Sequence, residues 1–396
     1  MIKRNIPLSY LLAFSKTTWF WLGIWIFYYL NFTNYAGVGI IETVMILSFT
    51  LSEIPTGALA DLLGKKRALI LAFFLEAVGS LIMAMAVNFQ FLLVSVCIMC
   101  IGGALYSGTI DALVYDSLKE EGKEDIYDKK ISHINTISLI VPALCGIIGG
   151  YMYKIHPTLP FYANTLGYLF GFAVSFFIVE PHIDTEKFSF TSFVKQSRQG
   201  LKELFKTGRV KNQTLLLLSI GFFMVISGEM LESFLAYDFG FDEIKLSYLT
   251  STIFIVSALA SLLTPVLRKT LRGNLFTIIF GLLIALTLLV SPLLGLITGG
   301  LTLTLRASLG GIFANHTSTA INNTTQSKYR ATTLSTFNML KNIPYVLTAY
   351  LIGSMTDAFS PRVISFYLGI VMLILIGLQF LPKKISGDYD KLTNNR

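Results

Sequence analysis

The sequence predicts an all-α polytopic membrane protein with twelve transmembrane helices, arranged as two six-helix bundles related by pseudo-symmetry. Hydrophobic residues make up 54% of the 396 positions and charged residues 14%, whereas a soluble domain carries about 25% charged residues. Apolar stretches of about 20 residues, the length that crosses a bilayer, recur along the whole chain. Together these observations exclude a soluble globular protein.

The twelve predicted spans follow one another with short polar connections. They cover residues 8–30, 39–60, 68–87, 91–115, 131–152, 160–179, 213–236, 247–267, 275–291, 294–319, 333–355 and 362–381. Spans nine and ten nearly run together, and only Ser291-Pro292 marks their boundary. Residues 1–180 hold the first bundle, residues 181–212 form a polar linker, and residues 213–396 hold the second bundle and a short tail.

The lysines and arginines predict the orientation in the membrane. With a cytoplasmic N-terminus, 25 of the 31 fall on the cytoplasmic side and 3 on the outer side, as the positive-inside rule requires. We expect a multi-pass protein of the inner (cytoplasmic) cell membrane with both termini in the cytoplasm. The first apolar run is too long for a cleavable signal. The net charge of +8 then indicates contact with acidic membrane lipids rather than with nucleic acid.

The linker contains a predicted amphipathic helix. Its apolar residues fall on one face and its basic residues on another: Phe190, Phe193, Val194, Leu201, Leu204 and Phe205 against Lys195, Arg198, Lys202 and Lys206. This pattern is typical of a helix that lies in the membrane interface, and a helix that docks a partner is the alternative. Twelve spans in two related halves are a common plan of secondary transporters.

A tight loop joins spans two and three, with the sequence Gly57-Ala-Leu-Ala-Asp61-Leu-Leu-Gly64-Lys65-Lys66-Arg67. This loop resembles the loop 2–3 signature of the major facilitator superfamily, and the predicted topology agrees over the whole chain. The stretches Glu53–Gly57, Ser107–Asp116 and Arg330–Ser335 look like a bacterial, drug-exporter-like branch of that family. The resemblance implies secondary transport by alternating access.

The resemblance implies a cytoplasmic gate formed by Gly57, Asp61, Gly64, Lys65, Asp116 and Arg330. Asp61 would face the N-terminal end of helix 11, whose unpaired amides carry partial positive charge. That helix would start near Arg330 with a threonine cap, and Lys65 would pair with Asp116. These contacts would latch the halves in the outward-open state. Leu62 replaces the arginine that is frequent in the family, which implies a thinner charge network. A topology signal with a tight turn is the alternative.

Five ionisable residues lie inside spans that line the central cavity of the family fold, namely Lys16, Asp111, Glu229, Glu232 and Arg306. Such a residue costs about 2.5–3.5 kcal/mol on insertion scales, so it usually faces protein or water and has a role. This coincidence predicts the transport path.

The roles of these five residues differ. Glu229 and Glu232 are three apart, hence on one helix face, and neighbouring acids hinder each other's ionisation, which suits proton coupling; simple exposure to outer water is the alternative. Asp111 is either a second proton site or the partner of Lys16. Arg306 keeps its charge, so it either binds an anionic substrate group or holds a carboxylate.

Two further patterns concern spans one and five. Span one is rich in aromatic residues, which either stack on a substrate or pack and anchor the helix; Phe20, one turn from Lys16, is the best cavity candidate. The run Pro142–Gly150 partly resembles the helix-5 motif of family exporters, although such glycines mostly serve packing. The helix-4 arginine linked to proton coupling in many family antiporters is missing from Ile98–Gly102.

The sequence favours a proton-driven exporter of small amphiphilic molecules. One alternative is a proton-coupled importer of an anionic or zwitterionic nutrient bound by Lys16 and Arg306. Another is a lipid flippase or a non-transporting membrane sensor. The expected partners are a small-molecule substrate and membrane lipids, and we expect a monomer. No nucleophile–base pair, phosphate loop or metal cluster appears in the sequence, so we expect no enzyme, no metal and no cofactor beyond the proton gradient.

Overall fold

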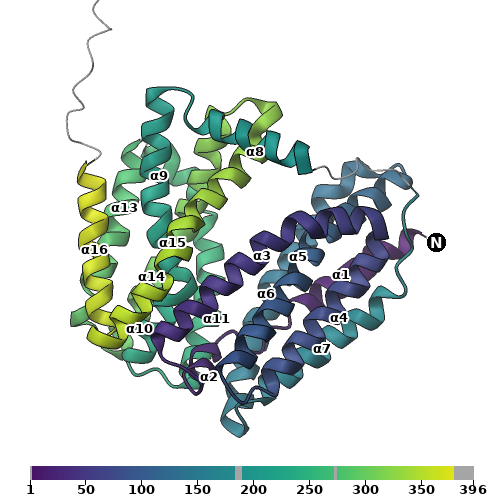
Figure 1. The fold of residues 1–396 in the computed structure, drawn as a ribbon. Coiled ribbons are helices and arrows are strands. Elements are labelled where there is room, and N and C mark those ends of the chain that lie inside the picture. Colours follow the sequence, from purple (N-terminus) through teal and green to yellow (C-terminus); the bar gives the residue numbers. More distant parts are fainter. Residues whose placement is uncertain (1, 183–189, 272–273, 379–396) are drawn as a thin grey trace, which may run out of the picture.

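The computed structural model describes residues 2–182, 190–271 and 274–378, and every regular element in these ranges is helical (Figure 1). The first bundle contains α1 (Asn5–Lys16), α2 (Trp25–Tyr29), α3 (Tyr35–Leu63), α4 (Lys65–Ala84), α5 (Phe89–Glu120), α6 (Tyr127–Ile155) and α7 (Leu159–Ser175). Short 3-10 turns, η1 (Ile2–Arg4) and η2 (Glu124–Ile126), precede α1 and α6.

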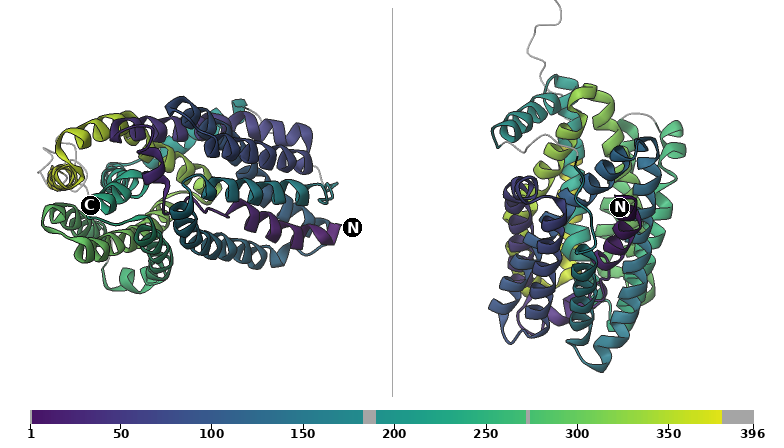
Figure 2. Two further views of the ribbon diagram at one scale, coloured as in Figure 1. Left: turned by 90° about the horizontal axis from the view of Figure 1, so that it is seen from below. Right: turned by 90° about the vertical axis from the view of Figure 1, so that its right-hand side faces the viewer.

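The second bundle follows the linker helix α8 (Phe190–Leu204). It contains α9 (Gly208–Ile226), the π-helical turn η3 (Ser227–Leu231), α10 (Glu232–Asp238), α11 (Glu243–Ser261), α12 (Thr264–Thr270), α13 (Asn274–Leu289), η4 (Ser291–Leu293), α14 (Leu296–Thr324), η5 (Ser327–Tyr329), α15 (Arg330–Phe359) and α16 (Pro361–Leu378). The two bundles lie side by side (Figure 2).

Within the described ranges, eight helical segments are long and apolar enough to cross a membrane. These are α3, α4, α5, α6, α9 with α10, α11, α14 and α16. The other four predicted spans correspond to the broken pair α1 and α2, to α7 and α13 with 17 and 16 residues, and to α15. The twelve-helix, two-bundle fold class is therefore present.

The first span is not the continuous helix expected over residues 8–30. It breaks after Lys16, and helix resumes only at Trp25. Tertiary contacts satisfy the exposed backbone of the break: the N–H of Phe20 donates to Asn164 Oδ1 at 2.9 Å. A Cβ on Gly149 would lie 1.7 Å from the Phe20 carbonyl oxygen, so α6 can approach the break only with glycine there. Irregular backbone inside a membrane protein needs such partners.

The halves meet mainly through two helix pairs, α3 with α15 and α6 with α11. In the first pair, Thr43 Oγ1 donates to the carbonyl of Val346 at 3.2 Å. In the second, Ser251 Oγ donates to the carbonyl of Ala143 at 2.7 Å. These contacts lie toward the end of the molecule opposite α8, and the bundles diverge toward α8 (Figure 1). The structure is thus closed on the face opposite α8, called the far face below.

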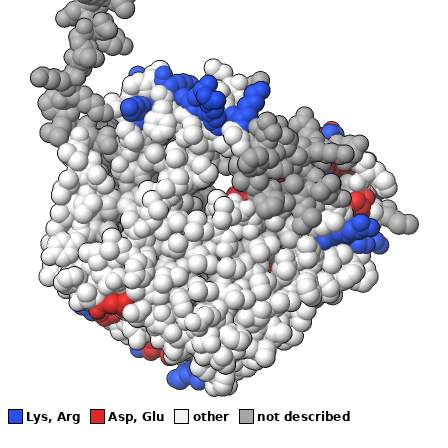
Figure 3. Space-filling view, in the orientation of Figure 1, with Lys and Arg blue, Asp and Glu red and all other residues white. Residues whose placement is uncertain are grey.

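Helix α8 packs on the second bundle, against α15 and α9. A Cβ on Gly200 would lie 2.4 Å from Thr336 Oγ1, so this contact with α15 is close. The side chains of Lys195, Arg198 and Lys202 are exposed, and basic residues gather over this end of the molecule (Figure 3). The linker helix therefore presents a basic surface on one side and covers α15 with the other.

Candidate functional site

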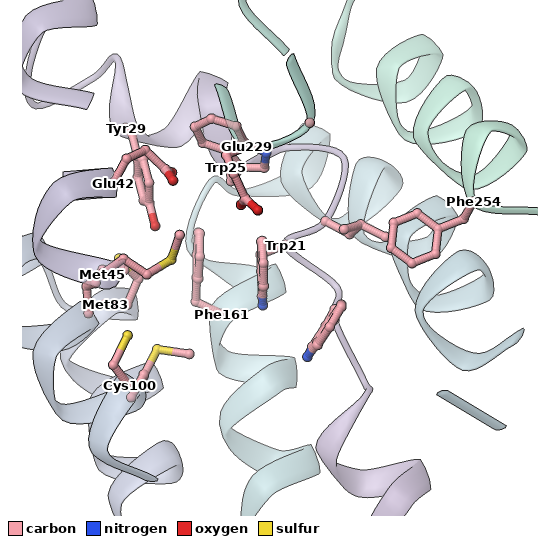
Figure 4. A pocket seen from close by; sticks show the side chains of 15 residues that line it. Trp21, Trp25, Tyr29, Glu42, Met45, Met83, Cys100, Phe161, Glu229 and Phe254 are labelled. Carbon is pink, nitrogen blue, oxygen red and sulfur yellow. The ribbon is translucent and has the colours of Figure 1, made fainter. Parts of the chain in front are cut away.

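A cavity of about 440 Å³ lies between the two halves (Figure 4). Its wall is formed by residues from seven of the predicted spans: Trp19, Trp21, Leu22, Trp25, Tyr29, Glu42, Met45, Met83, Val96, Met99, Cys100, Phe161, Gly228, Glu229 and Phe254. Rings and thioethers dominate this wall, and polarizable sulfur and aromatic faces adapt to ligands of varied shape.

The break in the first span places the aromatic rings. Trp19 and Trp21 lie in the non-helical segment, and Trp25 and Tyr29 lie on the short α2, and all four line the cavity. In a continuous helix, positions 21, 25 and 29 would share one face, but position 19 would lie on another, since residues two apart do not share a face. The irregular backbone therefore adds Trp19 to the wall formed by the other three rings.

Phe20 does not have the role expected from the sequence. It is absent from the described lining of this cavity and of the chamber below it. Its backbone instead contacts the neighbouring helices: the N–H donates to Asn164, and the carbonyl lies against Gly149. The neighbours Trp19 and Trp21 take the cavity positions.

Two carboxylates stand at one end of the cavity, from Glu42 on α3 and Glu229 in the π-turn η3 (Figure 4). Glu229 is exposed to the cavity and interacts electrostatically with Lys341 of α15. Glu42 is 4% exposed, and its Oε2 accepts a hydrogen bond from Tyr345 Oη at 3.3 Å. Single π-turns are rare and frequently occur at functional sites.

The π-turn also separates Glu229 from Glu232, which were expected on one face. Glu232 is absent from the described cavity lining and accepts a hydrogen bond from Ser227 Oγ at 3.0 Å. It interacts electrostatically with Arg306. The wider turn of a π-helix rotates the chain relative to α-helical spacing. Glu229 therefore faces the cavity, whereas Glu232 faces Arg306.

A second chamber of about 350 Å³ adjoins the first and shares Trp19, Trp21, Met45, Met99 and Cys100 with it. Lys16 and Glu76 line this chamber and form an ion pair. The Lys16 ammonium also lies 5.7 Å from the ring centre of Tyr106 and 5.9 Å from that of Tyr168. Of the two roles left open for Asp111, pairing with Lys16 is not found: the exposed Asp111 lies within electrostatic range of Tyr106 and Tyr127.

Arg306 is fully buried between α14 and the end of α13, away from both chambers. Its Nε donates to Thr287 Oγ1 at 3.0 Å, and its Nη2 donates to the Thr287 carbonyl at 2.7 Å. Of the two roles left open for it, substrate contact does not fit this position. The guanidinium ties helices of the second bundle together beside Glu232.

On the α8 side, Lys65 Nζ lies 2.6 Å from Asp116 Oδ2, so the structure contains the expected pair. The carboxylate of Glu180 accepts hydrogen bonds from the backbone N–H groups of Lys65 and Lys66, both at 2.7 Å. A carboxylate in this position stabilises the N-terminus of α4. The loop is thus held by charge from α5 and from the chain after α7.

For the other predicted gate residues, the part of the chain that the structure describes does not show the contacts expected from the sequence. The surroundings of Gly57 and the side chain of Asp61 lie outside the described residues, so the contact expected between Asp61 and helix 11 is outside them too. Arg330 starts α15, and its exposed side chain donates to the Asn322 carbonyl at 3.2 Å. The expected threonine cap is wrong: Tyr329 occupies the cap position, and its side chain does not cap the helix.

We expect Gly64→Ala to lower the free energy of unfolding by about 1–3 kcal/mol, because Gly64 has φ +83° and ψ 157°, a region almost exclusive to glycine. A Cβ there would also lie 2.9 Å from the carboxyl carbon of Glu180. Thermal unfolding of the purified protein measures the loss. Gly122→Ala is the comparison, because Gly122 has φ +65° and open space around it. Equal losses in the two variants would contradict a role for Glu180.

The model of the major facilitator superfamily matches residues 8–349. The chain belongs to this family. It is 26% identical over 239 residues to the uncharacterized MFS-type transporter YxaM of Bacillus subtilis (strain 168), a match covering 57% of each chain. An uncharacterized transporter of Rickettsia felis is 27% identical over 127 residues, or 31% of this chain and 30% of that protein. The chain therefore spans 57% of the length of the first of these curated relatives and 30% of the second.

Solved structures show the same fold. The nucleoside transporter NupG has a TM-score of 0.78 at 16% identity, covering 96% of this chain and 98% of that one. A bacterial homologue of the lysosomal transporter Spinster, solved inward-facing and unoccupied, has a TM-score of 0.72 at 15% identity, covering 96% of each chain. At these identities the likeness concerns fold alone. Membership of this family agrees with the prediction of a multi-pass membrane transporter rather than an enzyme.

One cavity residue of this facilitator was missed in the sequence. Glu42 is an acid inside the predicted span 39–60, so the rule that singled out the other intramembrane charges applies to it equally. Glu42 lies on span two, which is not one of the spans that line the central cavity in the family fold. In the structure it lines the same end of the cavity as Glu229 (Figure 4).

Proposed function

We propose that this facilitator exports small amphiphilic cations in exchange for protons. The observation that carries the proposal is the pairing of two carboxylates, Glu42 and Glu229, with an aromatic wall in one cavity. A cation gains from the faces of tryptophan and tyrosine rings, by about 2 kcal/mol or more when water is excluded. The carboxylates supply the charge complement at one end of that wall.

Anionic substrates fit the cavity poorly. Lys16 is already paired with Glu76, and Arg306 is buried among α13 and α14. These were the two residues on which an importer of an anionic or zwitterionic nutrient would depend. Lys341 is the remaining intramembrane cation near the cavity, and it faces Glu229. The charge pattern of the chamber therefore favours a cation.

Exchange follows from competition for the same carboxylates. A carboxylate can hold a proton or a substrate cation, and binding of one weakens binding of the other. We take the α8 face as cytoplasmic, because basic residues gather there. The facilitator is then inward-open, with its cavity acids ready to release protons to the cytoplasm and receive substrate. The inward proton gradient across the inner membrane would drive substrate outward.

Glu229→Gln is expected to abolish proton-driven transport and to weaken cation binding about tenfold, the change for a lost charged contact of roughly 1.5 kcal/mol. Labelled tetraphenylphosphonium is a suitable probe, because it is a rigid aromatic cation. Its uptake is measured in proteoliposomes with an imposed pH gradient, and its affinity by equilibrium binding to the purified protein.

The matched control is Glu124→Gln, an exposed acid of the loop before α6. It should transport as the unmodified protein does. Normal gradient-driven uptake by Glu229→Gln would contradict the role of Glu229. Binding of the probe without any transport by the unmodified protein would favour a sensor, and transport of labelled lipid alone would favour a flippase.

A further inference from the structure

Glu42 stands where the central cavity meets the contact that closes the far face. Its side chain lines the cavity and is 4% exposed. The next residue, Thr43, makes the hydrogen bond from α3 to the Val346 carbonyl of α15. One turn earlier, a Cβ on Gly39 would lie 2.3 Å from the Ala349 carbonyl oxygen. The acid is thus part of the interface between the halves.

The hydrogen bond of Glu42 crosses that interface. Tyr345 Oη, on a side chain that is fully buried, donates to Glu42 Oε2 at 3.3 Å. The other titratable groups facing Glu42 are Tyr29 from α2, Cys100 from α5 and Glu229 from η3, while Lys341 of α15 faces Glu229. Glu229 therefore repels a negative charge on Glu42, and Lys341 interacts with Glu229.

A charge on Glu42 and closure of the far face oppose each other. Burial of an ionised carboxylate is unfavourable unless it is well paired, and here a phenol is its hydrogen-bond donor among the described residues. Separation of α3 from α15 would remove Tyr345 and admit water, which stabilises the ionised form. A protonated carboxyl carries no charge, so it can be buried without this cost, and it still accepts the hydrogen bond from Tyr345.

We infer that Glu42 couples proton binding to closure of the outer face of this facilitator. The inference rests on the proposed exchange and assigns its coupling residue. In the outward-open state, Glu42 takes a proton from the outer solution, and an O–H bond forms at its carboxylate. The halves then close on the neutral acid. Inside, an arriving substrate cation displaces the proton to the cytoplasm and neutralises the carboxylate in its turn, so one proton enters for each cation that leaves.

A labelling experiment without substrate tests the inference. Thr43→Cys is introduced after Cys97, Cys100 and Cys145, the three native cysteines, have each been replaced by serine. A membrane-impermeant maleimide is added on the outer side of oriented vesicles at acidic and at alkaline external pH. We expect acidification to lower the labelling rate about tenfold, the change that follows from a tenfold difference in proton affinity between the two conformations.

Two variants of the acid and its donor sharpen the result. Glu42→Gln should give slow labelling at both pH values, because the amide is always neutral. Tyr345→Phe should raise labelling at acidic pH, because the bond across the interface is lost; Tyr350→Phe, on the exposed face of the same helix, should change nothing. An unaltered pH response in Glu42→Gln would overturn the inference, as would an absent pH response in the Thr43→Cys protein that keeps Glu42.

A contact at the outer surface provides an independent comparison. The carboxylate of Asp357 accepts hydrogen bonds from the backbone N–H groups of Tyr35 and Ala36, at 3.0 and 2.9 Å. Asp357→Asn should raise labelling at both pH values while the response to pH persists. Loss of the response in Asp357→Asn would make Asp357 the proton sensor and overturn the inference.

Failure of the inference and failure of the proposed exchange give different results. Glu42→Gln should bind tetraphenylphosphonium through Glu229 and carry it down its gradient, but it should not accumulate it against the gradient with protons. Full proton-driven accumulation by this variant overturns the inference and leaves the exchange intact. Absence of transport in the unmodified protein overturns the exchange, whereas the labelling experiment still reports on Glu42.

Discussion

Gly39→Val is expected to abolish transport and to hold the facilitator open on its far face. A Cβ on Gly39 would meet the Ala349 carbonyl oxygen at 2.3 Å and the Tyr350 Cα at 2.9 Å. A Cβ on Gly353 would meet the Tyr35 carbonyl oxygen at 2.2 Å. These two glycines let the backbones of α3 and α15 touch, as small residues do between membrane helices. Backbone atoms cannot swing aside as a flexible side chain can.

The obstruction in Gly39→Val concerns only the other half of the molecule. Apart from the backbone of α3 itself, the three atoms nearest to the added Cβ all belong to α15. Each bundle should therefore fold normally, and only closure should fail. A facilitator that cannot close one face cannot alternate, so uptake of the cation into proteoliposomes should fall to background.

Labelling at Thr43→Cys gives the second measurement for Gly39→Val, and it should become fast and independent of external pH. Gly108→Val is the control, because nothing lies within 4 Å of a Cβ at Gly108. Gly39→Ala should give an intermediate result, since its single methyl group needs a smaller displacement. Transport at the normal rate by Gly39→Val would show that the contact between α3 and α15 is dispensable for the cycle.

The architecture could be predicted from the sequence because the bilayer imposes it. The length of the hydrocarbon core sets the length of each apolar run, and helices are the elements that satisfy their own backbone there. The break after Lys16 could not be predicted in this way. The run is apolar throughout, and the partners that permit the break, Asn164 and Gly149, lie more than a hundred residues away.

The candidate site was predicted unevenly, for a geometric reason. The pair Lys65–Asp116 was anticipated because a loop signature fixes the position of both residues. The partners of Lys16 and Arg306 depend on how each helix is rotated about its axis, which hydropathy does not determine. The π-turn before Glu232 shifts the register again. The sequence therefore identified charged positions more reliably than their neighbours.

Arg306→Ala is expected to lower the free energy of unfolding by about 3–5 kcal/mol, the cost of breaking a buried charged network by removing one partner. The substitution would remove the hydrogen bonds that Arg306 donates to the Thr287 carbonyl and hydroxyl and the positive charge beside Glu232. It would also open a cavity at one of the largest fully buried side chains of the described chain. Poor yield and a lowered unfolding temperature should follow.

Arg306→Lys separates structural from substrate-binding roles. Lysine keeps the charge but lacks the planar fork that reaches two acceptors of Thr287 at once, so it should recover only part of the lost stability. Arg330→Ala, at an exposed arginine, should retain normal stability. If Arg306 instead bound substrate, Arg306→Ala would keep normal thermal stability and show only weaker binding of the transported compound. Because Arg306 holds α13 to α14 out of reach of the cavity, thermal unfolding measured beside cation affinity in Arg306→Lys distinguishes the two roles: stability should fall while affinity for tetraphenylphosphonium stays near normal.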